Sequence, residues 1–436
     1  MKPAPGIMTY TETIDFLYSQ LPVFHRIGKA AYKANLNNTL ALDRHFGHPH
    51  QRFKSIHIAG TNGKGSVSHI LASVLQEAGY NTALYTSPHL KDYRERIRID
   101  GAMIPEAEVI AFVENNTVII RSVNPSFFEM SVAMAFEYFA KEKVDVAVIE
   151  TGLGGRLDST NIITPLLSVI TNIGHDHMDL LGDSLEKIAV EKAGIIKKNV
   201  PVIIGETLPE TRNIFSEKAA LMGSDLFFAG ETYDCTLEDP DMLSEVRKFN
   251  LRDRGSGELI TGESALIGDY QKSNLQVVFS AVNILKDQFH ISDRNIIDGI
   301  RKVILNTGLK GRWQILGRDP LIVCDTGHNM EGLAYVMKQI DRIPKSGLHM
   351  VIGFVRDKDL RALLSLFPED ATYYFTKASV PRALDERILQ AEALKFGLMG
   401  NIYPRVINAF EAAKENASGD EMIFIGGSTF VVAEVL

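Results

Sequence analysis

The first residues that could do chemistry form the glycine-rich run GTNGKGS at positions 60–66. It follows an apolar, partly β-branched stretch at 53–59 and precedes a helical pattern that Gly79 ends. Backbone amides at such a strand-to-helix turn can bind phosphate, and Lys64 can neutralise its charge. The spacing is shorter than in the common phosphate loop, because Ile58 stands where that motif has its first glycine. We therefore expect a shortened phosphate loop, rather than a glycine-rich turn with a surface lysine.

Polar residues follow three apolar runs, each at the point where a strand should end. They lie at 86–89, 150–152 and 174–177. In α/β sheets, ligands gather beyond the carboxyl ends of the strands. A hydroxyl, a carboxylate and an imidazole from these three places could hold Mg²⁺ between phosphates and protein. Imidazole is an unusual ligand for so hard a cation, so the His-x-His pair of the last segment is also typical of a structural or zinc-like role.

A second glycine-rich turn, GLGG at 152–155, invites comparison with a dinucleotide-binding motif. That interpretation fails because Leu157 stands where the third glycine of G-x-G-x-x-G belongs. A turn that lets the backbone approach a ligand, carrying Arg156 and Asp158, accounts better for the segment.

The elements that must position these residues alternate between strand and helix patterns. Apolar runs lie at 82–86, 144–149, 166–171 and 200–204, and helical patterns lie at 128–140 and 185–196. This alternation predicts an α/β fold with a mostly parallel, doubly wound sheet. The polar stretch at 231–264 predicts a hairpin excursion, and a helix is expected at about 270–286.

A second unit begins after the segment NTGLKGRW. Its two glycines and two cations predict a linker at 306–312, so we expect one domain at 1–305 and another at 313–436. Apolar runs at 321–324, 348–353, 371–375 and 422–425, with helices between them, predict a smaller Rossmann-like α/β domain.

Length and composition fit a folded chain of two or more domains. The chain has 436 residues, 45% of them hydrophobic and 23% charged, and a net charge of 46 − 54 = −8. This charge disfavours non-specific nucleic-acid binding, and no apolar run has the length of a membrane span. Cys235 and Cys324 alone exclude a disulfide framework and a thiolate zinc site, so we expect a reducing cytoplasm.

Eight segments taken in order carry a resemblance to a known family. They are AGTNGKGS, TSPHLKDYRERIRIDG, SFFEMSVAMAFEYF, ETGLGGRLDSTN, TNIGHDH, EKAGI, GRWQ and DTGHN. Together they closely resemble the folylpolyglutamate synthase and dihydrofolate synthase family of the Mur-ligase superfamily, over nearly the whole chain. The resemblance implies an ATP-dependent amide ligase of folate biosynthesis and one-carbon metabolism. ATP would phosphorylate a pteroate or folate carboxylate, and the amine of L-glutamate would attack the acyl phosphate.

The resemblance also implies roles for individual residues. The ATP-binding set matches Gly60, Thr61, Asn62, Gly63, Lys64, Gly65, Ser66, Asn274, Arg312, Asp325 and His328. The second domain would bind glutamate and close over ATP. Taken singly, each of these residues has an ordinary alternative. Asn274 is equally typical of an amide in a surface helix, Arg312 of a linker cation and Asp325 of a strand-end cap.

The metal ligands implied by the match are Ser87, Glu150 and His177, holding Mg²⁺, with two ions expected in all. Lys192 matches a lysine that the family carries as a carbamate formed with CO₂, and Lys64, His177 and Lys192 would be catalytic. Without the resemblance, a lysine in the helix LEKIAVEKAGI would be interpreted as a solvated charge.

The pterin site implied by the match comprises Ser126, Phe127, Phe128, Glu129, Leu157, Asp158 and Ser159. Two phenylalanines suit stacking on a flat heteroaromatic ring, but residue patterns alone favour packing at the start of a helix. The chain has DTGHN where the family often has DGAHN, and His175 stands at a position that often differs in the family; the match favours His177 as the ligand.

Three functions remain open at this point. The chain could be a bifunctional dihydrofolate and folylpolyglutamate synthase, a ligase limited to one of these steps or to another Mur-type substrate, or a nucleotide-binding module. The complete metal set argues against the third, and SFFE with LDS favours dihydropteroate as a substrate. A monomer is expected, with small molecules as partners and neither nucleic acid nor membrane.

Overall fold

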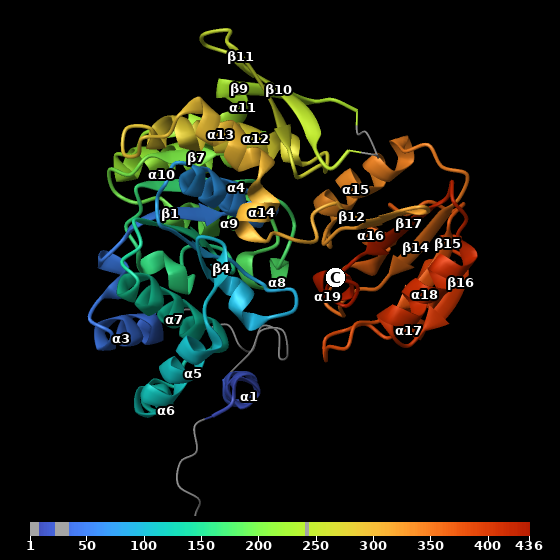
Figure 1. Ribbon diagram of the computed structural model, residues 1–436, viewed down its shortest axis with the longest axis horizontal. Helices are drawn as coiled ribbons and strands as arrows, with labels where there is room; N and C mark the ends of the chain where they lie inside the picture. The colour runs from blue at the N-terminus through green and yellow to red at the C-terminus, as the bar shows by residue number, and fades with distance from the viewer. Residues whose placement is uncertain (1–7, 22–34, 240–243) are drawn as a thin grey trace, which may run out of the picture.

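The computed structural model describes residues 8–21, 35–239 and 244–436, which form two α/β bodies side by side (Figure 1). The first body, coloured blue to yellow, contains an eight-stranded sheet with an antiparallel excursion at its edge. The second body, orange to red, contains a six-stranded sheet. In the described part of the chain, no helix is long and apolar enough to cross a membrane.

The large sheet has the strand order β4-β3-β2-β5-β1-β6-β7-β8, and all neighbours from β2 to β8 in that order are parallel. Only the pairings of β3 with β2 and with β4 are antiparallel. The predicted mostly parallel sheet is therefore confirmed. The strand bounds are β1 Lys54–Ala59, β2 Thr82–Tyr85, β3 Ile97–Ile99, β4 Ala102–Met103, β5 Val146–Glu150, β6 Leu167–Ile170, β7 Val202–Ile204 and β8 Leu226–Phe228.

Helices cover both faces of this sheet, so its central strands are apolar on both sides. In β5, Val146 and Val148 pack into the core beneath α4 and α12, while Ala147 and Ile149 pack into the core beneath α7. The helices of this body are α1 Tyr10–Gln20, α3 Asn37–His45, α4 Lys64–Glu77, α5 Glu106–Asn115, α6 Thr117–Val123, α7 Phe127–Lys141, α8 Met178–Leu181, α9 Leu185–Lys192, α10 Pro209–Met222, α11 Ala229–Thr232, α12 Gln271–Leu285, α13 Asp293–Arg301 and α14 Val303–Thr307. Short 3₁₀ turns are η2 Pro49–Gln51, η3 Tyr93–Arg96, η4 Ser159–Ile162 and η5 Ala193–Ile195.

The predicted hairpin excursion is a three-stranded antiparallel sheet of β9 Tyr233–Leu237, β10 Arg247–Asp253 and β11 Leu259–Ser264. Cys235, Phe249 and Leu251 turn inward and join the core that contains α12. The excursion is thus anchored to the main body by one apolar face.

The second sheet has the order β12-β13-β17-β14-β15-β16, with only the edge strand β12 antiparallel. Its strands are β12 Gln314–Arg318, β13 Leu321–Cys324, β14 Leu348–Ile352, β15 Thr372–Thr376, β16 Gly400–Tyr403 and β17 Met422–Gly426. Its helices are α15 Met330–Arg342, α16 Leu360–Leu364, α17 Glu386–Leu394, α18 Val406–Asn416 and α19 Thr429–Ala433. The four predicted strands are present. The two additional strands, β12 and β16, lie at the edges of the sheet, where side chains are partly exposed, so their sequences lack the apolar run that indicates a strand.

The passage between the two bodies runs from the end of α14 at Thr307 to the start of β12 at Gln314. Helix α14 therefore overlaps the first two residues of the predicted linker. One ion pair joins the bodies: Asp269 of the first body pairs with Arg342 of the second, and it also binds Arg247 of its own body at 2.6 Å. The domain limits themselves stay a prediction.

Candidate functional site

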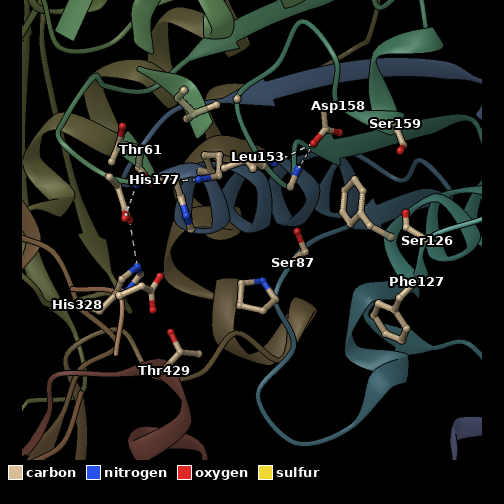
Figure 2. A pocket seen from close by; sticks show the side chains of 18 of the residues that line it. Thr61, Ser87, Ser126, Phe127, Leu153, Asp158, Ser159, His177, His328 and Thr429 are labelled. Carbon is tan, nitrogen blue, oxygen red and sulfur yellow. Dashed lines mark hydrogen bonds and ion pairs between the residues drawn. The ribbon is translucent and has the colours of Figure 1, made fainter. Parts of the chain in front are cut away.

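Two cavities lie where the bodies meet, beyond the carboxyl ends of the strands of the large sheet. We call the first, of about 270 Å³, the aromatic cavity, and the second, of about 290 Å³, the phosphate-loop cavity. Both are lined by Thr61, Lys64, Ser87, Pro88, His328 and Thr429, so the cavities meet there. Figure 2 shows Ser87 between Ser126 and Phe127 on one side and His328 and Thr429 on the other.

Each residue predicted for the site lines at least one of the two cavities. Besides the shared residues, the aromatic cavity contains Gly60, Ser126, Phe127, Phe128, Glu129, Leu157, Asp158, Ser159, His177 and Lys192. The phosphate-loop cavity contains Asn62, Gly63, Gly65, Ser66, Glu150, Asn274, Arg312 and Asp325.

The glycine-rich loop joins β1 to α4 through Gly63, which caps the helix with φ 84°. A Cβ at Gly63 would lie 2.4 Å from Asn274 Oδ1, so the turn needs glycine both for its backbone angle and for the approach of α12. Lys64 Nζ donates to the carbonyl oxygens of Gly60 (2.9 Å) and Thr61 (3.1 Å). The lysine thus folds back over the loop, at the junction of the cavities.

Lys192, the last residue of α9, is only 3% exposed and lines the aromatic cavity. Its Nζ donates to the carbonyl oxygen of Gly60 at 2.8 Å, the same oxygen that Lys64 uses. Burial, and then the charge of Lys64, lower the pKa of Lys192 well below its usual value. The interpretation of Lys192 as a solvated charge, which residue patterns alone favoured, is wrong.

Glu150 ends β5 and is 4% exposed. Its carboxylate accepts one hydrogen bond in the described part of the chain, from the Ser87 amide at 3.3 Å. Burial raises the pKa of Glu150 to about 7, and the charge of Lys64 opposes that rise. A buried carboxylate with one long hydrogen bond fits a cation ligand.

His177 precedes α8 in a left-handed conformation with φ 50°, and burial lowers its pKa to about 4. A neutral imidazole is the form that binds metal. His175 is exposed and lines neither cavity. Of the two histidines, the structure therefore places His177 on the cavity wall.

Asp176, between the two histidines, connects the bodies. It binds Lys358 Nζ at 2.7 Å and His328 Nε2 at 3.3 Å. Burial raises the pKa of Asp176, but the His328 hydrogen bond and the charges of His177, His328 and Lys358 together lower it below its usual range. Asp176 is therefore an anion in the wall of the aromatic cavity, at a place where the two bodies meet.

Further contacts across the same gap involve the predicted ATP-binding residues. Asn62 and Asn329 exchange side-chain hydrogen bonds at 3.2 and 2.9 Å. Asp325 of the second body accepts from Tyr270 Oη of the first body at 2.6 Å. Within the second body it also accepts from the Trp313 amide at 2.6 Å, and Arg312 of the linker donates to the Thr326 hydroxyl. The phosphate-loop cavity is thus enclosed by both bodies.

On the other side, Ser126 and Glu129 form a capping box at the start of α7. The Ser126 amide donates to Glu129 Oε2 at 2.5 Å, and the Glu129 amide donates to Ser126 Oγ at 3.2 Å. Asn38 of α3 also donates to Glu129 at 3.2 Å. Both residues fix the first turn of α7, which carries the two phenylalanines.

The two phenylalanines differ in their surroundings. Phe127 is 5% exposed and stacks on Tyr18 with a 5.0 Å centroid distance, so it belongs largely to the core. Phe128 is half-buried and lies against Gly152, where a Cβ would be 2.5 Å from its ring. Glycine at 152 lets the Phe128 ring lie close against the turn.

Asp158 holds the GLGG turn together. Its Oδ2 accepts from the Gly152 and Leu153 amides at 2.8 Å each, and its Oδ1 accepts from the Thr160 amide (3.0 Å) and hydroxyl (2.6 Å). His57 Nε2 lies 2.8 Å from the same hydroxyl. Burial raises the pKa of Asp158 despite these donors. Its side chain therefore shapes the cavity wall, with both oxygens engaged.

Several cavity residues were not predicted from the sequence, among them Arg96, Lys358 and Arg382. Arg96 lies within the segment TSPHLKDYRERIRIDG that carried the resemblance, so the motif contained a signal for it. Lys358 and Arg382 come from loops of the second body that follow no recognisable motif.

Comparison with known proteins places the chain in a family. The Mur ligase middle domain matches residues 58–282, and the Mur ligase glutamate ligase domain matches residues 311–429. A dihydrofolate synthase/folylpolyglutamate synthase of Bacillus subtilis is 32% identical over 93% of this chain and 95% of its own length. A folylpolyglutamate synthase of Lacticaseibacillus casei is 32% identical over 98% of each.

Comparison with solved structures indicates the same family. E. coli FolC in complex with DHPP and ADP has a TM-score of 0.85 at 27% identity, covering 99% of this chain and 98% of that one. The folylpolyglutamate synthase of Mycobacterium tuberculosis complexed with ADP has a TM-score of 0.87 at 26% identity, covering 98% and 97%. The chain is therefore a Mur ligase, an ATP-dependent enzyme that forms carbon–nitrogen bonds. Within that class it belongs to the folylpolyglutamate synthase and dihydrofolate synthase family, and the resemblance seen in the sequence is confirmed.

Proposed function

We propose that the enzyme adds L-glutamate both to dihydropteroate and to tetrahydrofolate glutamates, with ATP as co-substrate and an acyl phosphate as intermediate. A carboxylate oxygen attacks the γ-phosphorus of ATP and ADP leaves. The glutamate amine then attacks the acyl carbon, losing a proton, and phosphate leaves. A ligase limited to one of these acceptors, or to another carboxylate, is the alternative.

The observation that carries this proposal is the meeting of the two cavities at Thr61, Lys64 and Ser87. A phosphate donor in one cavity and a carboxylate acceptor in the other would react at this junction. Because both bodies enclose the junction, water is kept from an acyl phosphate that it would otherwise hydrolyse.

On the nucleotide side, the amides of residues 63–65 at the start of α4 would bind phosphate oxygens, since the Thr61 and Asn62 amides donate to Asn172. Lys64 would leave its two carbonyl partners for the transferred phosphate and offset its charge. Asn274, Arg312, Asp325 and His328 would hold the remainder of ATP against the second body, whose role would be to bind glutamate.

Ser87, Glu150 and His177 fit as Mg²⁺ ligands, because they place a hydroxyl, a sparsely hydrogen-bonded carboxylate and an imidazole around the junction. Bound Mg²⁺ would draw charge from the phosphate oxygens during transfer. Two ions are expected from the resemblance.

Lys192 fits the proposed carbamate. Its amine is buried with a lowered pKa, and in the described part of the chain it has no ion-pair partner. The ammonium would first release its proton, and the neutral amine would then add CO₂ and release a second proton, which replaces a cation with an anion. The carbamate would then help to position the second metal ion.

The aromatic cavity would bind the pterin ring. Phe128 offers an aromatic face, Leu157 adds apolar surface, and the turn held by Asp158 places backbone groups near the ring. Ser126, Glu129 and Ser159 would shape this wall.

An ADP-release assay with L-glutamate and either dihydropteroate or tetrahydrofolate tests the proposal. We expect release with both acceptors, dependent on glutamate. Release with one acceptor alone would identify a monofunctional ligase, and release with neither would refute a folate substrate. A cytoplasmic monomer whose partners are small molecules stays the expectation from the family resemblance.

A further inference from the structure

Arg96 is a buried cation of the aromatic cavity for which the proposed function has no role so far. It is the last residue of η3, a turn fixed by a capping box between Asp92 and Glu95. Arg96 is only 3% exposed, yet it lines the cavity. Its guanidinium carbon lies 5.2 Å from the centre of the Phe127 ring.

The direct contacts of Arg96 with described residues include the His89 ring and the Phe127 ring, neither of which is a carboxylate. Its Nε donates to His89 Nδ1 at 2.7 Å, so that nitrogen accepts and the imidazole is neutral. In the described part of the chain, Arg96 forms no ion pair. Arg247, whose side chain is equally buried at 4% exposed, pairs with Asp269 at 2.6 Å. Because a buried charge without a direct ion-pair partner is costly, an anion bound in the cavity beside Arg96 would stabilise it.

The position of Arg96 indicates which anion this is. It lines the aromatic cavity but not the phosphate-loop cavity, which separates it from the proposed ATP phosphates. Its guanidinium lies over the Phe127 ring, and it lines the same cavity as Lys64 and Ser87 of the junction. The cavity that contains Arg96 therefore includes both the proposed ring site and the junction where phosphoryl transfer would occur.

We propose that Arg96 binds the carboxylate of the pteroate-type substrate, the group that receives the phosphate. This inference rests on the proposed function. The guanidinium can donate two parallel hydrogen bonds to a carboxylate, which fixes its plane as well as its position. One oxygen attacks the γ-phosphorus as the bond to ADP breaks, while the other becomes the acyl carbonyl and keeps its contact with Arg96.

The test compares two ligands that differ only in charge: dihydropteroate, which has a single carboxylate, and its carboxamide. Binding is measured by calorimetry to the full chain with Mg²⁺ and ADP, which allow no phosphoryl transfer. For the parent enzyme we expect a preference for the carboxylate of about ten-fold to hundred-fold, the range of hydrogen bonds to charged groups. In Arg96→Gln the two affinities should agree within about two-fold, and Arg96→Lys should regain part of the preference.

Arg94→Gln is the matched control, because Arg94 belongs to the same turn, pairs with Asp92 and lines neither cavity. It should keep the parent preference. If Arg96→Gln weakens both ligands equally, Arg96 only supports the Phe127 wall and the inference is overturned. If the parent enzyme binds neither ligand, the proposed function has failed instead. Each variant is judged by the ratio of its affinities for the carboxylate and the carboxamide. Partial unfolding lowers both affinities alike and leaves this ratio unchanged.

Discussion

The two cavities are built in different ways. The phosphate-loop cavity includes one contiguous loop, residues 61–66 at the start of α4, together with residues of both bodies, and Asn62 and Asn329 exchange hydrogen bonds between the bodies. The aromatic cavity is formed by side chains from separate segments, including η3, the first turn of α7 and the turn after β5. Phosphate binding would thus depend mainly on the conformation of one loop, whereas recognition of the acceptor would depend on how several segments pack together.

This difference predicts which substitutions separate the two substrates. Changes in the loop should affect catalysis with either acceptor, whereas changes in the aromatic wall should alter acceptor affinity and leave ATP unaffected. The residues at the junction belong to both cavities, so the largest effects are expected there.

Lys64→Ala should have the largest effect. We expect kcat to fall by about a thousand-fold or more, because the lysine would offset charge on the transferred phosphate. Dihydropteroate binding, measured by calorimetry, should stay within a few-fold of the parent. Near-normal ADP release by this variant would contradict the assignment of the phosphate loop.

Lys192→Ala should follow, with a loss of about a hundred-fold to a thousand-fold because a charged group beside the transferred phosphate is removed. Acetate or formate should restore part of the rate by replacing the carbamate anion. Lys192→Arg should not be rescued, since the guanidinium cannot form a carbamate. Carbon-13 NMR after exposure to labelled bicarbonate tests the parent enzyme directly. A fully active Lys192→Arg would overturn the carbamate.

Glu150→Gln should raise the Mg²⁺ concentration needed for half-maximal activity by about ten-fold, because the amide keeps the size of the side chain but loses its charge. Excess Mg²⁺ should restore the rate only in part. Unchanged Mg²⁺ dependence in a metal titration would assign Glu150 to packing instead.

Phe128→Leu should raise the KM for dihydropteroate by about two-fold to ten-fold, the usual contribution of an aromatic pair, and leave the KM for ATP unchanged. Phe46→Leu is the control, because Phe46 stacks on Phe112 and lines neither cavity. Equal effects of the two substitutions would mean that Phe128 acts through general packing.

The smallest effect concerns the start of η3, outside both cavities, where Asp92 binds Arg94 at 2.6 Å and Tyr10 of α1 at 2.8 Å. Burial raises the pKa of Asp92, but these hydrogen bonds lower it to about 2 overall. A carboxylate whose pKa is lowered by folding stabilises the folded state above its unfolded pKa, and this stabilisation is lost as pH falls towards 2. Asp92→Asn should therefore be less stable than the parent at pH 7, with a difference that shrinks between pH 4 and 2 in urea titrations.

The same contrast explains what could be predicted from the sequence. The phosphate loop is contiguous, and its glycines, lysine and flanking elements revealed it directly. Glu150 and His177 could be placed because parallel strands bring their carboxyl ends to one edge. The edge strands β12 and β16 were missed, since their burial is incomplete.

Lys192 and Arg96 show where residue patterns fail. On a helix, a lysine is ordinarily solvated, and only the fold reveals that the last turn of α9 ends inside a cavity. Arg96 lies on a short turn, where no periodic pattern indicates burial. It contacts Phe127, which is distant in the chain, and His89, which a bend of the chain brings close. Lys358 reaches the junction only because a second sheet is placed against the first.

The burial of Arg96, which is only 3% exposed yet lines the aromatic cavity, has a consequence for the response to salt. Dissolved ions screen charges on a protein surface within about 10 Å at 0.1 M ionic strength, but they screen buried charges much less. This chain has a net charge of −8, so its long-range field repels anionic ligands, while the buried cation Arg96 attracts them at short range. Added salt therefore weakens the repulsion more than the attraction, and moderate ionic strength should speed the entry of anionic substrates rather than slow it.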